Sequence, residues 1–122
     1  MSTERRGIGE LESEVLAALW AAEPEAATPS EVQAAMGSDL AYTTVMTILS
    51  RLWKKGLVER QRQGRAYAYR PLLSEADLAA RRMQAQLDRT RDREAALSRF
   101  VDSLPRRDER ALRRILHKLE QA

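Results

Sequence analysis

Apolar residues recur every three or four positions along the first part of the chain, a spacing that predicts amphipathic helices. The first predicted helix covers residues 10–22, and Pro24 ends it because proline cannot continue a helix. Its apolar stripe consists of Ile8, Leu11, Val15, Leu16, Leu19 and Trp20. A short second helix is expected between Thr28 and Gly37, because Thr28-Pro29-Ser30-Glu31 has the form of a capping box and glycine stops helices.

A third helix is predicted to run from Ala41 or Tyr42 to Lys55, with Gly56 as its stop signal. Its inward-facing residues are Val45, Ile48, Leu49 and Leu52. Its opposite face carries Thr43, Thr44, Thr47, Ser50 and Arg51. Threonine is a mediocre helix former, so a requirement other than helix propensity accounts for the threonines on this face.

After Gly56 the spacing of apolar residues changes to two, the period of a β-strand. Residues 57–62 and 66–70 are therefore predicted to be strands, joined by the turn 63–65 into a β-hairpin. The hairpin lies in the most basic part of the chain, since residues 51–70 hold seven basic side chains and one acid. Such a block is a candidate for phosphate contacts or, with equal weight, an ordinary solvated surface.

From Ser74 onward the pattern is helical again, with apolar positions that are sparse among charged ones. One helix opens at Ser74, a second stripe ends at Pro105, and Asp108 opens the last helix. These stripes are too thin to enclose a core, so we expect them to pack against a second copy of the chain, with packing inside one chain as the alternative. The residues expected in this dimer interface are Leu78, Leu87, Leu97, Phe100, Val101, Leu104, Leu112, Ile115, Leu116 and Leu119.

The composition argues against several classes of function. The 122 residues include no cysteine and one histidine, His117, which excludes disulfides, thiolate metal sites and most imidazole-based sites. We therefore expect no metal, no cofactor and no enzymatic activity. No apolar run approaches the roughly 20 residues of a membrane span, and residues 1–9 lack the apolar region of a signal peptide. We expect no membrane insertion and a cytoplasmic location.

Three helices followed by a basic hairpin is the order of a winged helix-turn-helix, so the expected fold is mostly α with a small β-hairpin. We expect a winged-helix DNA-binding domain at residues 8–73 and a helical dimerisation domain at residues 74–122. A helix with small polar side chains can enter the major groove, where threonine hydroxyls contact base edges and phosphates. The hairpin would bring Arg65 to the phosphates beside that groove.

The stretch from Leu40 to Val58 resembles the recognition-helix signature of the BlaI/MecI family of bacterial repressors. Further segments resemble the family's first helix and wing: Gly9-Glu10-Leu11-Glu12, Val15, Leu19-Trp20 and Arg65-Ala66-Tyr67-Ala68-Tyr69. The resemblance covers residues 8–73 strongly and residues 74–122 weakly. It implies a homodimeric repressor that binds double-stranded operator DNA with inverted TACA/TGTA half-sites and that commonly controls β-lactam-resistance genes.

The residues expected to contact DNA are Thr28, Ser30, Tyr42, Thr43, Thr44, Thr47, Arg51, Lys54, Lys55 and Arg65. Other roles compete for some of them. Tyr42 would pack equally well against the second helix, and Lys54 and Lys55 are favourable charges at a helix C-terminus. Free N–H groups at the start of the second helix suit a phosphate, but Glu31 competes for them.

In the β-lactam branch of the family, a membrane metalloprotease senses the drug and the repressor is cleaved before a Phe in its dimerisation segment. The resemblance thus implies a sensor metalloprotease as partner and a cut at Arg99-Phe100, although the branch has Asn where this chain has Arg99. The family's copper branch uses a C-terminal cysteine pattern, which this chain lacks.

The alternative function is a winged-helix module that binds proteins and not specific DNA. Interaction modules usually display apolar hot spots, which the threonine-rich face and the basic hairpin do not resemble. Arg5 and Arg6 form either an arm that reaches a minor groove or a frayed terminus, with the frayed terminus favoured.

Overall fold

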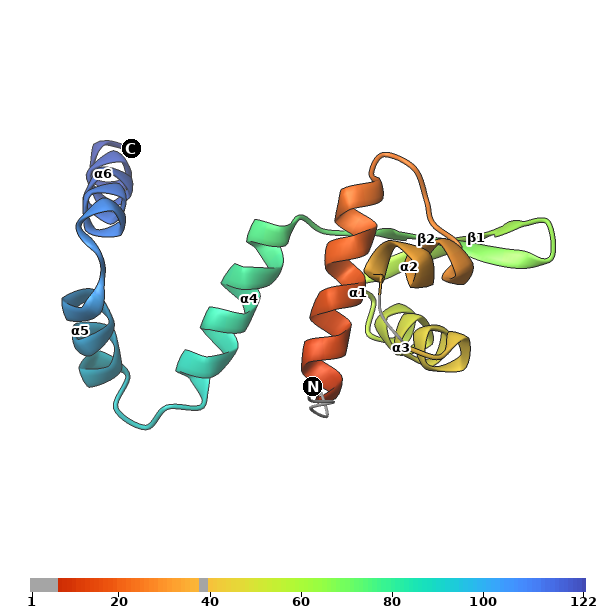
Figure 1. Ribbon diagram of the computed structural model, residues 1–122. Helices are drawn as coiled ribbons and strands as arrows, with labels where there is room; N and C mark the ends of the chain where they lie inside the picture. The colour runs from red at the N-terminus through yellow and green to blue at the C-terminus, as the bar shows by residue number, and fades with distance from the viewer. Residues whose placement is uncertain (1–6, 38–39) are drawn as a thin grey trace. The chain divides into compact units, whose positions relative to one another are not determined.

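The computed structural model describes residues 7–37 and 40–122, which form six helices and one antiparallel hairpin (Figure 1). In chain order the elements are α1 (Ile8–Ala22), α2 (Pro29–Met36), α3 (Tyr42–Lys54), β1 (Val58–Gln63), β2 (Ala66–Pro71), α4 (Glu75–Asp88), α5 (Arg93–Ser103) and α6 (Arg106–Gln121). The order and type of the predicted elements are confirmed. Arg5 and Arg6 lie outside the described residues.

The first three helices and the hairpin share one apolar core. Its buried side chains are Val15, Leu16, Leu19, Ala27, Val32, Val45, Ile48, Leu49, Leu52, Val58, Tyr69 and Leu78. The predicted inward face of α3 is confirmed, because all of its members are buried. Removing apolar side chains from water is the dominant force that stabilises a domain of this size. The core therefore holds α3 with its threonine face turned outward.

The chain divides into two compact units, residues 1–79 and 80–122, so the boundary lies inside α4 and not between residues 73 and 74. The reason is the first turn of α4. Leu78 is 6% exposed and belongs to the core of the first unit. This corrects its placement in a dimer interface. The indole N–H of Trp20 also donates a hydrogen bond of 3.0 Å to the Leu73 carbonyl, which ties the start of this segment to α1.

The hairpin differs from the prediction by one residue at its turn. Gly64 and Arg65 form a two-residue turn between Gln63 and Ala66, and Gly64 adopts a φ of +67°, where glycine is unstrained. A further pairing is not visible in the sequence pattern. Ala27 and Tyr69 exchange backbone hydrogen bonds of 2.9 and 2.8 Å, which attach the α1–α2 connection to β2.

The capping signals act as predicted in α2 and α4. Thr28 Oγ1 accepts the Glu31 N–H at 3.3 Å and Glu31 Oε1 accepts the Thr28 N–H at 2.9 Å, the reciprocal contacts of a capping box. Gly37 ends α2 in the left-handed conformation. Ser74 Oγ accepts the Asp77 N–H at 3.0 Å at the start of α4. These local contacts define where each helix begins and ends.

The second unit consists of the end of α4 with α5 and α6. No residue of α5 or α6, both fully described, is buried. Its exposed apolar side chains are Met83, Leu97, Phe100, Val101, Ile115, Leu116 and Leu119, whereas Leu87, Leu104 and Leu112 are half-buried. Helix α6 begins at Arg106 and not at the predicted Asp108, because Pro105 provides an extended cap whose carbonyl accepts the Glu109 N–H.

Polar contacts hold the turn between α4 and α5. Arg93 donates a hydrogen bond of 2.9 Å to Asp88, and with a second hydrogen bond from Gln84 it holds the pKa of the Asp88 carboxyl below its ordinary value. Asp92 caps α5 by accepting the Ala95 N–H at 3.0 Å. Beside this turn lies a largely apolar hollow of about 650 Å³, lined in part by Met83, Leu87, Leu97 and Phe100.

Candidate nucleic-acid interface

The threonine face of α3 is open to solvent. Thr43 and Thr47 are exposed and Thr44 is half-buried. The Thr47 hydroxyl donates a hydrogen bond of 2.9 Å to the Thr43 carbonyl, so its proton is used inside the helix while its oxygen can still accept. A shallow hollow of about 270 Å³ lies between this face and the start of α1, lined by Ile8, Leu11, Thr43, Thr44, Thr47, Ile48 and Arg51.

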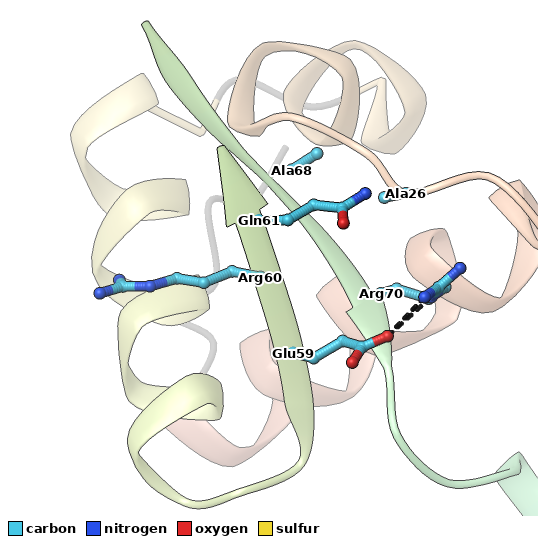
Figure 2. A pocket seen from close by; sticks show the side chains of 6 residues that line it. All are labelled: Ala26, Glu59, Arg60, Gln61, Ala68 and Arg70. Carbon is cyan, nitrogen blue, oxygen red and sulfur yellow. Dashed lines mark hydrogen bonds and ion pairs between the residues drawn. The ribbon is translucent and has the colours of Figure 1, made fainter. Parts of the chain in front are cut away.

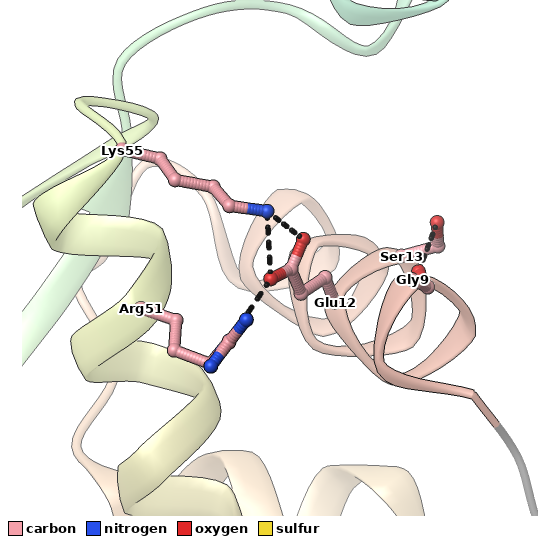
Figure 3. Close-up of polar contacts among 5 residues, drawn as sticks. All are labelled: Gly9, Glu12, Ser13, Arg51 and Lys55. Atoms are coloured by element: carbon pink, nitrogen blue, oxygen red, sulfur yellow. Dashed lines mark hydrogen bonds and ion pairs between the residues drawn. The ribbon is translucent and has the colours of Figure 1, made fainter.

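Glu12 on α1 is the one charged residue that is buried among those the structure describes, with an exposed fraction of 4%. The Lys55 ammonium donates to both of its carboxylate oxygens, at 2.8 and 2.9 Å, and Arg51 Nε lies 3.6 Å from its Oε2 (Figure 3). Sequence reasoning missed Glu12. The helical spacing could have indicated that Glu12 is buried, because position 12 shares a helix face with the core residues Leu16 and Leu19.

Arg60 is a second residue whose role was not predicted. Its guanidinium carbon lies 3.7 Å from the centre of the Trp53 ring and 4.1 Å from that of Tyr67, so both aromatic rings contact it. Stacking of this kind stabilises a cation and fixes the plane of the guanidinium. Because Trp53 is on α3 and Tyr67 on β2, Arg60 connects the third helix to the hairpin.

The opposite side of β1 has a different arrangement (Figure 2). Arg70 donates two hydrogen bonds to Glu59 Oε2, at 2.6 and 3.0 Å, from its register partner position on β2. The figure shows Glu59 and Gln61 on this side and Arg60 on the other. The one acid of the basic block is thus paired with Arg70, so it does not neutralise any other cation of the block.

The four basic residues expected to contact DNA differ in their surroundings. Lys54 and Arg65 are exposed and have no acidic partner within the described part of the chain. Lys55 and Arg51 share Glu12, which sequence reasoning did not foresee. Lys54 and Arg65 are therefore the cations most available to a phosphate.

Phosphate contacts were also expected at the start of α2 and at the start of α3, and the structure treats the two places differently. The Thr28 N–H donates to the Glu31 carboxylate and the Glu31 N–H donates to the Thr28 hydroxyl, so both backbone donors already have acceptors within the capping box. Ser30 is exposed beside them. Tyr42, the first residue of α3, is 41% exposed, so it lies at the surface where the helix begins.

The described residues contain no group of three or more potential metal-ligating side chains, His117 included. No helix among them is both long enough and apolar enough to cross a lipid bilayer. The surface of the first unit carries hydroxyls on the exposed face of α3, Arg65 at the hairpin tip, and Arg60 against the rings of Trp53 and Tyr67.

Three helices on a hairpin, with the polar face of the third helix beside a basic hairpin, define a winged-helix protein. Residues 8–118 match the sequence profile of the penicillinase repressor family. The chain belongs to that family, which comprises DNA-binding transcriptional repressors and not enzymes.

Two comparisons with relatives agree with this assignment. The chain is 42% identical over 119 residues to the transcriptional regulator BlaI of Mycobacterium tuberculosis, and this match covers 93% of the chain and 85% of the relative. Among solved structures, a mutant of MepR from S. aureus aligns with a TM-score of 0.52 at 17% identity, over 91% of this chain and 76% of MepR. The second comparison supports the fold alone.

Proposed function

We propose that two copies of this repressor bind one inverted-repeat operator, each copy placing α3 in the major groove and the hairpin beside the phosphate backbone. The observation that carries the proposal is the exposed threonine face of α3, together with two exposed cations, Lys54 and Arg65, that have no acidic partner among the described residues. Small hydroxyl side chains can approach base edges, and cations without acidic partners can neutralise phosphates. Bacterial DNA lies in the cytoplasm, so the repressor would act there.

The apolar stripes of α5 and α6 support the homodimer in this proposal. Leu97, Phe100, Val101, Ile115 and Leu116 are each more than two-fifths exposed in the single chain, which is unfavourable in water. A second copy would bury the same surface twice through a two-fold axis. A dimer also doubles the DNA contacts, which a single small domain needs to reach specific affinity.

The direct test is a fluorescence-anisotropy titration with a duplex that holds a TACA/TGTA inverted repeat, beside a scrambled duplex, at several salt concentrations. We expect tight binding that prefers the repeat and weakens steeply with salt, because cations on the protein release counterions from the phosphates. Weak and equal binding to both duplexes would contradict the operator and would favour a protein-interaction module.

Thr44→Ala tests base readout by α3. If Thr44 contacts a base, we expect operator affinity to fall by about 1–3 kcal/mol while affinity for the scrambled duplex changes little. The two titrations above measure both values. Equal losses on the two duplexes would remove Thr44 from the residues that read sequence.

Arg65→Ala tests the contact of the hairpin tip with the backbone. We expect weaker binding to both duplexes and a slope of log affinity against log salt that is smaller by about one unit, because one phosphate contact is lost. Gln63→Ala, next to the same turn and without charge, is the matched control. An unchanged slope for Arg65→Ala would place the tip of the hairpin away from the DNA.

We propose further that repression is relieved by proteolysis of the C-terminal segment, with a membrane sensor metalloprotease as partner. Arg99 and Phe100, the expected cleavage position, are both exposed on α5. Mass spectrometry of the repressor from cells treated with a β-lactam would detect a fragment that ends at Arg99. An intact chain in treated cells in which the target genes are induced would exclude this route of relief.

A further inference from the structure

We infer that Glu12 on α1 sets the DNA specificity of this interface, by directing Arg51 and by reducing the charge that α3 presents to any phosphate. The inference rests on the proposed function and adds a positioning residue that does not itself touch DNA. It starts from an unusual placement, since the carboxylate of Glu12 is almost fully buried although carboxylates are strongly hydrated. Two cations, Arg51 of α3 and Lys55 directly after it, compensate for that loss of water.

The three side chains form a compact cluster between α1 and the last turn of α3 (Figure 3). Lys55 binds both oxygens of Glu12 at 2.8 and 2.9 Å, while Arg51 approaches one oxygen through Nε at 3.6 Å. The side chains of Arg51 and Lys55 are nevertheless 46% and 50% exposed. Each cation is therefore held by Glu12 at one side and open to a ligand at the other.

The direction of Arg51 follows from this contact. A guanidinium carries five N–H groups in one plane, and the carboxylate engages it through the Nε side. Because the Arg51 side chain is 46% exposed, it can still meet an acceptor outside the protein. Arg51 also lines the hollow shared with Thr44 and Thr47, so an acceptor that reaches these threonines meets an Arg51 side chain that the Glu12 carboxylate attracts at 3.6 Å.

The charge of the cluster matters for DNA of any sequence. Two cations and one carboxylate carry a net charge of +1, whereas the two cations alone would carry +2. Attraction to phosphates that is independent of sequence increases with the number of available cations. Glu12 therefore weakens binding to random DNA, while it keeps the oriented contact of Arg51 that a particular operator can use.

The decisive variant is Glu12→Gln, measured with the operator and scrambled duplexes after circular dichroism has established that it is folded. We expect affinity for the scrambled duplex to rise by about five- to tenfold at roughly 0.1 M salt and the salt slope to steepen by about one unit, because one cation is freed. The preference for operator should fall. A merely structural role of Glu12 would weaken binding to both duplexes and would not steepen the slope.

Three further variants separate the causes. Glu23→Gln removes the same charge from the exposed end of α1 and should leave the slope unchanged. Glu12→Gln combined with Lys55→Gln should return the slope to the wild-type value.

Arg51→Lys keeps the charge but loses the planar fork, so we expect an unchanged slope and a preference for operator that is lower by about tenfold. This variant tests the orientation of Arg51 even if Glu12→Gln does not fold, because Arg51 is half-exposed.

The inference is overturned if folded Glu12→Gln keeps the wild-type slope, if Glu23→Gln steepens the slope equally, or if Arg51→Lys retains the full preference for operator. In each of these cases the wild-type protein still prefers the operator, so the proposed function stands. If the wild-type protein itself shows no salt-dependent binding to either duplex, the proposed function fails and the inference fails with it.

Discussion

Phe100→Asp is expected to abolish the dimer and to lower operator affinity by about a hundredfold or more. Phe100 is 46% exposed on α5 and lines the apolar hollow between α4 and α5. Buried aromatic side chains commonly dominate the energy of an interface, and a carboxylate in their place would lose its hydration there. Loss of the dimer removes half of the DNA contacts. The remaining contacts of one copy would give the affinity of non-specific binding.

Sedimentation equilibrium measures the oligomeric state, and the anisotropy titration measures the affinity. Ser98→Asp is the control, since it introduces the same charge on the same helix at an exposed position outside the apolar stripe. It should leave both measurements near the wild-type values. A Phe100→Asp protein that sediments as a dimer would remove α5 from the interface.

Leu49→Ala is expected to give the largest loss of stability, about 2–5 kcal/mol in the free energy of unfolding. Leu49 on α3 is fully buried in the apolar core of the first unit. Truncation there removes transfer free energy and leaves a cavity that the packed helices fill only in part. Because domains are stable by only about 5–15 kcal/mol, this change is a large share of the total.

Thermal and urea unfolding followed by circular dichroism measures this loss. Leu72→Ala is the matched control, because the same side chain is truncated where it is 56% exposed. Its effect should stay within about 0.5 kcal/mol. Comparable losses for the two variants would contradict the position of Leu49 in the core.

Much of the fold could be predicted because its signals are local. The inward face of α3 follows from a spacing that any helix converts into one side of a cylinder, and all of its residues are buried as expected. The capping box at Thr28 and the stop at Gly37 were equally visible, because their partners lie within a few residues. The exposed threonine face followed from the same helical periodicity.

The candidate site could be predicted only in part. Thr43, Thr44 and Thr47 lie on an accessible face, and Arg65 lies at the tip of the hairpin. The contacts of these residues with DNA remain predictions. What the sequence pattern did not reveal is which cations already have partners inside the protein.

The sequence by itself determined the elements, their amphipathic faces and the membership of the chain in a repressor family. Only the tertiary structure decided that Glu12 binds Lys55 and Arg51, that Arg60 contacts the rings of Trp53 and Tyr67, and that Leu78 belongs to the first core. The physical reason is distance along the chain. Periodicity and caps depend on neighbours three or four residues apart, whereas Glu12 and Lys55 are 43 positions apart and meet only when the core aligns their helices.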